Sequence, residues 1–200
     1  MDERLHNGGA MAFGNDGKLY ITTGDAGKRL VYYSTPLQNY NTISHYNQFP
    51  FTPSSCSNQS LIIIYHRENA QPLNNVHGSI IRINEDGTVP GDNPFTEEYG
   101  YTNSYRCADY GGRVPDDAPD DAVCAEVWSN GLRNPFRIDM DPNEKEKVKF
   151  SFGVVGAQHI ESIYYGGTDY KGTNYGWPMY EGRNIKIRKH FKTHYILYPN

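Results

Sequence analysis

Short apolar segments separated by acidic-glycine turns recur along this chain. Three pairs of such segments cover residues 10–13 and 18–23, 78–84 and 88–89, and 136–140 and 147–152. The Asp-Gly steps at 16–17 and 86–87 supply the positive φ angle that a tight hairpin needs. The pattern therefore predicts an all-β chain built from repeated hairpins. Helical periodicity is weak throughout, and only residues 117–128 leave room for one or two helical turns.

Hairpins that recur every several tens of residues are typical of β-propeller blades. A blade takes about 40–50 residues, so this chain has room for a partial set of about three to four blades. A propeller closes by pairing its first and last blades, and an incomplete set leaves unpaired strand edges. We therefore expect either a fragment of a larger propeller or a reduced, divergent one.

Two long segments interrupt the hairpin pattern. Residues 28–66 are rich in Tyr, Asn, Ser and Pro, and residues 99–123 carry Gly111-Gly112 and an acidic cluster. Structureless segments of this length are uncommon within compact domains, so we interpret both as loop insertions. The predicted organisation is a propeller portion over residues 1–182, followed by a tail of unassigned role over residues 183–200.

The composition excludes some classes of protein. Twenty Gly and 12 Pro in 200 residues favour turn-rich β structure. A formal charge of -4 without a basic face argues against a nucleic-acid partner. The longest aliphatic run, residues 61–64, is too short to span a membrane. The first six residues lack the apolar core of a signal peptide, so an extracellular location requires a targeting segment that this sequence does not contain.

The three cysteines, Cys56, Cys107 and Cys124, leave at least one thiol unpaired or paired outside this chain. Cys107 and Cys124 flank a Gly/Pro/Asp-rich loop, so a loop-closing disulfide and two free thiols are both compatible with the spacing. The sequon Asn58-Gln59-Ser60 favours a secreted protein. No cysteine or histidine spacing typical of zinc sites is present.

The turn Gly131-Leu132-Arg133-Asn134-Pro135 is the strongest candidate binding element. Arginine offers a rigid fork of donors that suits carboxylate or quinone oxygens. The adjacent amide adds a further polar contact, although Asn134 could equally brace the turn through its own backbone. A histidine on the same face, such as His6, could move a proton.

An ordered series of motifs extends this picture. The motifs lie at residues 6–9 (HNGG), 13–25 (FGNDGKLYITTGD), 69–71 (NAQ), 78–83 (GSIIRI), 90–95 (PGDNPF), 131–135 (GLRNP), 153–156 (GVVG) and 174–178 (NYGWP). The series resembles the soluble glucose/sorbosone dehydrogenase family over about residues 5–27 and 68–182. The resemblance implies a six-bladed β-propeller, whose characterised dehydrogenases use pyrroloquinoline quinone (PQQ) with calcium. The same family includes a hedgehog-interacting-protein-like branch.

The resemblance also implies roles for individual residues. His6 matches the general base that acts on the sugar hydroxyl while hydride passes to the quinone. Arg133 and Asn134 match the pair that contacts the cofactor, where Arg133 would stabilise negative charge on the quinone oxygen. The backbone carbonyls of Val155 and Gly156 match the loop that binds calcium, and oxygen ligands suit this hard cation.

Other positions are expected to serve architecture, or depart from the family pattern. Asp25 ends the strand that leads toward the same face and is interpreted as a turn residue. Trp177 is expected to fill space between blades, and Glu161 to make a structural hydrogen bond. Many family members carry Asp where this chain has Val154, so a carboxylate is lost from the calcium loop.

Two functions of different classes follow from the sequence. The first is a quinoprotein oxidoreductase that oxidises a sugar or alcohol hydroxyl, supported by His6, Arg133 and Asn134. The second is a non-catalytic extracellular propeller that binds a protein or carbohydrate, favoured by the long insertion, the odd cysteine count and Val154. A remnant without activity is a third hypothesis.

Overall fold

The computed structural model describes residues 5–27, 69–157 and 160–182 in full, and the backbone alone at 31–35, 61–65, 68 and 184–185. Its contacts divide the chain into two compact units, one formed by Met1–Lys28 and Arg67–Asn200 and the other by Arg29–His66.

The described part of the smaller unit is an antiparallel strand pair, β3 (Val31–Thr35) with β4 (Leu61–Tyr65). These strands are the described part of the predicted insertion at 28–66. Cys56, the sequon at 58–60 and the part of the predicted tail beyond Ile185 lie outside the described residues.

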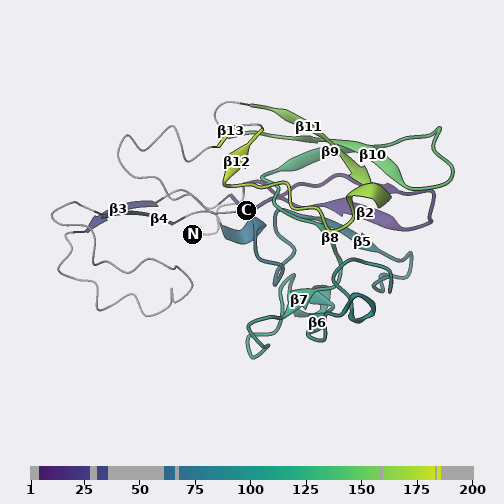
Figure 1. Ribbon diagram of the computed structural model, residues 1–200, viewed down its shortest axis with the longest axis horizontal. Helices are drawn as coiled ribbons and strands as arrows, with labels where there is room; N and C mark the ends of the chain where they lie inside the picture. The colour runs from purple at the N-terminus through teal and green to yellow at the C-terminus, as the bar shows by residue number, and fades with distance from the viewer. Residues whose placement is uncertain are drawn as a thin grey trace. The chain divides into compact units, whose positions relative to one another are not determined.

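The larger unit begins with a four-stranded antiparallel sheet in the order β1-β2-β5-β8 (Figure 1). Its strands are β1 (Met11–Phe13), β2 (Leu19–Thr22), β5 (Ile80–Ile83) and β8 (Val127–Ser129). The first predicted hairpin is confirmed, because β1 pairs with β2 across a turn in which Gly17 has φ of 71°. The second is only partly correct: β5 pairs with β2 and β8, and residues 88–89 form no strand.

The second sheet has the order β11-β10-β9 and is also antiparallel. It contains the third predicted hairpin, β9 (Pro135–Met140) with β10 (Lys149–Val154), followed by β11 (Ser162–Gly167). The described residues also form two short strand pairs, β6 (Ser104–Tyr105) with β7 (Val123–Cys124) and β12 (Tyr180–Glu181) with β13 (Asn184–Ile185). Short 3-10 turns connect the strands: η3 (Glu68–Ala70), η4 (Glu97–Tyr99), η5 (Cys107–Tyr110) and η6 (Thr168–Tyr170).

The fold class is all-β, and its successive antiparallel sheets form a partial β-propeller, as the hairpin pattern predicts. The helical turns considered for residues 117–128 are not formed, because that stretch enters β7 and β8 instead. Within the part of the chain that is described, no helix is long and apolar enough to cross a bilayer.

The main core is formed by large side chains of the two sheets. In β10, every second residue is buried, namely Phe150, Phe152 and Val154, because successive side chains of a strand point to opposite faces. They pack with Tyr20 of β2 and Ile80 of β5. β9 contacts β1 and β2, so the second sheet lies against the start of the first (Figure 1).

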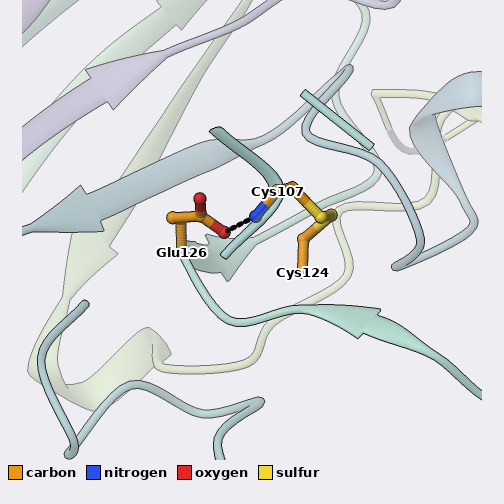
Figure 2. A group of neighbouring side chains, drawn as sticks. All are labelled: Cys107, Cys124 and Glu126. Carbon is orange, nitrogen blue, oxygen red and sulfur yellow. Dashed lines mark hydrogen bonds between the residues drawn. A yellow bond between two sulfur atoms is a disulfide. The ribbon is translucent and has the colours of Figure 1, made fainter. Parts of the chain in front are cut away.

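The excursion between β5 and β8 forms a second core around a disulfide. Cys107 and Cys124 are bonded and fully buried, which confirms the pairing that the sequence left open. Figure 2 shows the carboxylate of Glu126 beside them. Glu126 is 1% exposed and accepts hydrogen bonds from the backbone N–H groups of Cys107 (3.0 Å) and Ala108 (2.8 Å). The start of η5 is therefore fixed by a covalent bond and by a charged acceptor.

A buried arginine joins this excursion to the first sheet. Arg82 of β5 is 4% exposed, and its guanidinium donates to Asp16 (2.8 Å), Asp92 (2.8 Å) and Asn93 (2.9 Å). Its charge also lies 4.8 Å from the ring centroid of Trp128, within the range of a cation–π contact. The hydrogen bond from Arg82 lowers the pKa of Asp92. Because Asp16 comes from the first hairpin, this network fixes the turns of the sheet relative to one another.

Candidate functional site

His6 lies in a segment that crosses the end of β2. Its φ angle is 58°, a left-handed conformation that is uncommon for residues other than glycine and costs about 1–3 kcal/mol. The segment fits there because Gly24 has no side chain: a Cβ on Gly24 would lie 1.8 Å from the carbonyl oxygen of His6. Such backbone strain is frequent at functional sites, so the position of His6 is a first indication of one.

The imidazole of His6 is bonded to a buried carboxylate. Its Nδ1 lies 2.6 Å from Oδ1 of Asp25, and the two side chains are 12% and 0% exposed. A carboxylate accepts only, so the hydrogen bond assigns a proton to Nδ1, and in the neutral imidazole the lone pair is then on Nε2. The pair therefore presents a histidine whose outer nitrogen can accept a proton.

Asp25 is both a turn residue, as expected, and the partner of His6. Its Oδ1 also accepts the backbone N–H of Gly27 at 2.9 Å, which closes the turn. Its Oδ2 accepts the indole Nε1–H of Trp177 at 2.8 Å. Since three donors surround one buried carboxylate, its orientation is fixed.

The Arg133-Asn134 turn lies directly beside Asp25. The carbonyl of Arg133 accepts the backbone N–H of Asp25 at 2.8 Å. Asn134 Oδ1 accepts the backbone N–H of Gly8 at 3.0 Å, so this side chain reaches the His6 segment and does not brace its own turn. The structure thus brings His6, Asp25, Arg133 and Asn134 together. The order of the motifs along the sequence indicated only part of this grouping.

Arg133 is half-buried between a carbonyl and an aromatic ring. Its Nη1 donates to the carbonyl oxygen of Val155 at 2.9 Å. Its guanidinium carbon lies 5.6 Å from the ring centroid of Trp177. These two contacts fix the direction of the Arg133 guanidinium, and the bond to Val155 uses its Nη1 group.

The loop expected to bind calcium, residues 153–156, does not offer a suitable set of ligands for that ion in this structure. The Val155 carbonyl, one of the two expected ligands, already accepts a hydrogen bond from the positive Arg133, which would repel a calcium ion bound to the same oxygen. Val154 is buried in the main core and supplies no carboxylate. The nearby Glu161 and Glu181 accept the backbone N–H groups of Gly156 (3.1 Å) and Ala157 (2.6 Å). Glu161 thus makes the structural hydrogen bond expected of it.

A small cavity beside Arg133 is lined in part by Val155, Tyr175, Trp177 and Glu181, and its volume is about 20 Å³. It has room for one water molecule and is far smaller than the roughly 300–1,000 Å³ of a typical ligand pocket. Burial raises the pKa of Tyr175, and its hydroxyl donates to the Tyr165 carbonyl at 2.7 Å, so Tyr175 is no base at neutral pH.

Among the described residues, one group of His, Cys, Asp and Glu side chains lies close enough together to share a metal ion. It consists of Cys107, Cys124 and Glu126 (Figure 2). Metal binding by cysteine requires thiolates, and these two sulfur atoms are bonded to each other. The carboxylate of Glu126 already accepts two backbone N–H groups. This cluster is therefore structural.

Trp177 is a site residue whose contacts extend beyond the role that the sequence predicts. It was expected to fill space, and it is 5% exposed, but its indole also bonds the Asp25 carboxylate 152 residues away. The neighbouring Asn174 forms a reciprocal amide pair with Gln71, at 3.2 and 2.9 Å. The sequence motif at 174–178 indicates this segment but does not indicate the contact between Trp177 and Asp25.

The fold and the site together define an all-β protein in which a histidine bonded to a buried aspartate and an arginine–asparagine pair meet at one end of a sheet. The chain belongs to the Glucose / Sorbosone dehydrogenase family, whose model matches residues 57–105 and 103–194. The expected family is thus confirmed.

Three relatives illustrate this membership. Aldose sugar dehydrogenase YliI of Escherichia coli is 30% identical over 113 residues, which cover 56% of this chain and 23% of the relative. Quinoprotein glucose dehydrogenase B of Acinetobacter calcoaceticus is 28% identical over 178 residues, covering 88% and 27%. HIPL1 protein of Arabidopsis thaliana is 26% identical over 180 residues, covering 90% and 19%. The matches thus span about a quarter or less of each relative's length.

Proposed function

We propose that this chain provides the proton-accepting and cofactor-facing wall of a PQQ-dependent sugar dehydrogenase. The observation that carries the proposal is the hydrogen bond between His6 and the buried Asp25, directly beside Arg133. Family membership and two relatives named as an aldose sugar dehydrogenase and a quinoprotein glucose dehydrogenase support the substrate class and the cofactor. The substrate would be the hydroxyl of a sugar or a related alcohol.

His6 would act as the general base. Because the Nδ1–H of His6 donates to the Asp25 carboxylate, Nε2 is available to remove the proton from the substrate hydroxyl. The imidazolium formed in that step would be stabilised by the adjacent carboxylate, as in other histidine–aspartate pairs. Asp25 acts here as a positioning residue, since its oxygens face His6, Gly27 and Trp177 and do not face the substrate.

Arg133 and Asn134 would bind the cofactor. The Asn134 carbonyl oxygen is used by Gly8, which leaves its Nδ2 amide to donate to a ligand, and no described residue accepts from that amide. Arg133 adds a fixed positive charge where negative charge would develop. When bound, PQQ supplies the acceptor for the hydride. The donor character of this wall fits an oxygen-rich quinone, whereas we assign no role to calcium.

A second candidate is the non-catalytic extracellular propeller that binds a protein or a carbohydrate. The match to HIPL1 protein over 90% of this chain and the core position of Val154 favour it. An extracellular location is proposed for either function, because the Cys107–Cys124 disulfide is typical of oxidising compartments.

An activity assay separates the two candidates. The purified protein is incubated with PQQ, and aldose-dependent reduction of an electron-accepting dye is followed by absorbance. The proposal predicts turnover that requires both PQQ and the aldose. Glycerol and a longer polyol serve as alternative substrates to define the substrate class. Absence of dye reduction with every substrate at saturating PQQ would favour the non-catalytic propeller.

A further inference from the structure

Trp177 contacts both halves of the proposed site with two different parts of its indole. The Nε1–H edge meets Asp25, and the ring face meets Arg133. We infer that Trp177 is a positioning residue that fixes the proton-accepting pair and the cofactor-binding arginine relative to each other. This inference rests on the proposed function and adds a residue to its machinery.

The edge contact is a hydrogen bond to a buried charge. Trp177 is 5% exposed, Asp25 is 0% exposed, and the Nε1–Oδ2 distance is 2.8 Å. Hydrogen bonds to ionised acceptors are about twice as strong as neutral ones. Because Oδ1 of the same carboxylate faces His6 Nδ1, rotation of the Asp25 carboxylate would break both contacts. The indole therefore limits how far the imidazole can turn.

The face contact has the opposite polarity. The π-face of an aromatic ring is negative and attracts cations within about 6 Å of its centroid, and the guanidinium of Arg133 lies 5.6 Å away. One indole thus presents a positive edge to Asp25 and a negative face to Arg133.

Backbone contacts fix the indole in this place. The N–H of Trp177 donates to the carbonyl of Gly131 at 2.9 Å. Gly131 has φ of 75°, and a Cβ there would lie 2.1 Å from Asn174 Oδ1. The turn that begins Arg133's segment and the segment that holds Trp177 therefore fit together only with a glycine at 131.

The other tryptophan of the chain provides a matched control. Trp128 is 3% exposed in the main core, and its Nε1 has no hydrogen-bond partner among the described residues. Two equally buried indoles thus differ in the acceptor at their N–H group. The same substitution at each position separates the loss of an apolar ring from the loss of the contact to Asp25.

Nuclear magnetic resonance of the cofactor-free protein tests the contact without any activity. The indole N–H signals are assigned with Trp177→Phe and Trp128→Phe. We expect the Trp177 signal downfield of the Trp128 signal, as for a donor to a carboxylate, and we expect Asp25→Asn to shift it upfield while leaving Trp128 in place. The His6 Nδ1–H signal should also shift in Trp177→Phe. A Trp177 signal that Asp25→Asn does not move would overturn the inference, even if the enzyme is active.

Kinetics of the PQQ-loaded protein test the positioning role. We expect Trp177→Phe to lower kcat by about 10- to 100-fold, the loss that small displacements of reacting groups produce, while KM for the aldose changes less. Trp128→Phe should retain kcat in the folded fraction. If wild-type protein turns over and Trp177→Phe matches its kcat, the inference fails and the proposed function stands. If wild-type protein does not turn over with PQQ, the proposed function itself fails.

Discussion

His6→Ala is expected to lower aldose turnover by about a thousandfold while PQQ binding changes little. General bases contribute roughly 10²–10⁴ to enzymatic rates, and the structure offers His6 as the histidine bonded to a buried carboxylate. Removing the imidazole deletes the proton acceptor but leaves Arg133 and Asn134, the proposed cofactor contacts, in place. The measurement is steady-state dye reduction at saturating PQQ and aldose.

A matched histidine serves as control for that experiment. His77 is exposed and directly precedes Gly78, whose N–H donates to the Gly24 carbonyl beside the site. We expect His77→Ala to keep most of the activity, because no proton transfer is assigned to it. Equal turnover of His6→Ala and wild type would remove His6 from the mechanism.

Loss of the disulfide is expected to produce the largest change in stability. Cys107 and Cys124 are 17 residues apart, and closing a loop of that size stabilises a protein by about 3 kcal/mol. The double variant Cys107→Ser/Cys124→Ser should therefore lose about 3 kcal/mol of unfolding free energy in urea titrations. The effect should extend to the segment that supports the site, because Cys124 N–H donates to the Leu73 carbonyl at 2.7 Å.

A reductant distinguishes this bond from any other cystine. Treating wild-type protein with a dithiol should lower its unfolding midpoint, whereas the double variant should be insensitive. An equal loss in both proteins would trace the effect of the dithiol to Cys56, the cysteine left in the double variant, and would contradict a stabilising role for the Cys107–Cys124 bond in the second core.

Hairpins were predictable because they depend on local chemistry. The turn at 16–17 and the strands around it follow from an Asp-Gly step and alternating apolar residues, and β1 with β2 confirms them. The second hairpin was only half correct, since β5 pairs with strands far away in the chain, β2 and β8. The helical turns considered for residues 117–128 were wrong for a related reason. Val123–Cys124 pairs with β6, so tertiary contacts determine the structure of this stretch.

The candidate site was predictable residue by residue but not as a network. The motifs indicated His6, Arg133 and Asn134, which lie around one carboxylate. Asp25 followed a strand and ended in a turn, so nothing local distinguished it from an ordinary turn residue. Its bond to Trp177 joins positions 152 residues apart, and no sequence periodicity encodes such a contact. The Arg133–Val155 bond, which argues against calcium at that carbonyl, is of the same kind.

The site is a consequence of backbone hydrogen bonds between segments distant in sequence. The strand end at Asp25 bonds the carbonyl of Arg133, and Val155 N–H bonds the carbonyl of Asn134 at 2.9 Å. Leu132 N–H bonds the carbonyl of Gly78 at 2.9 Å. Because each segment fixes the next, the proposed base and the proposed cofactor contacts would need little rearrangement to meet one ligand, which is the preorganisation that electrostatic catalysis requires.

Calorimetric titration of PQQ into the purified protein tests whether Arg133 and Asn134 bind a quinone. The account predicts saturable binding that weakens at least about tenfold in Arg133→Gln, since a charge-assisted hydrogen bond contributes about 1.5–3 kcal/mol. Arg137→Gln, an exposed arginine on β9, should bind like wild type. No heat of binding in wild-type protein, or equal affinity in Arg133→Gln, would contradict the assignment of this wall to a quinone.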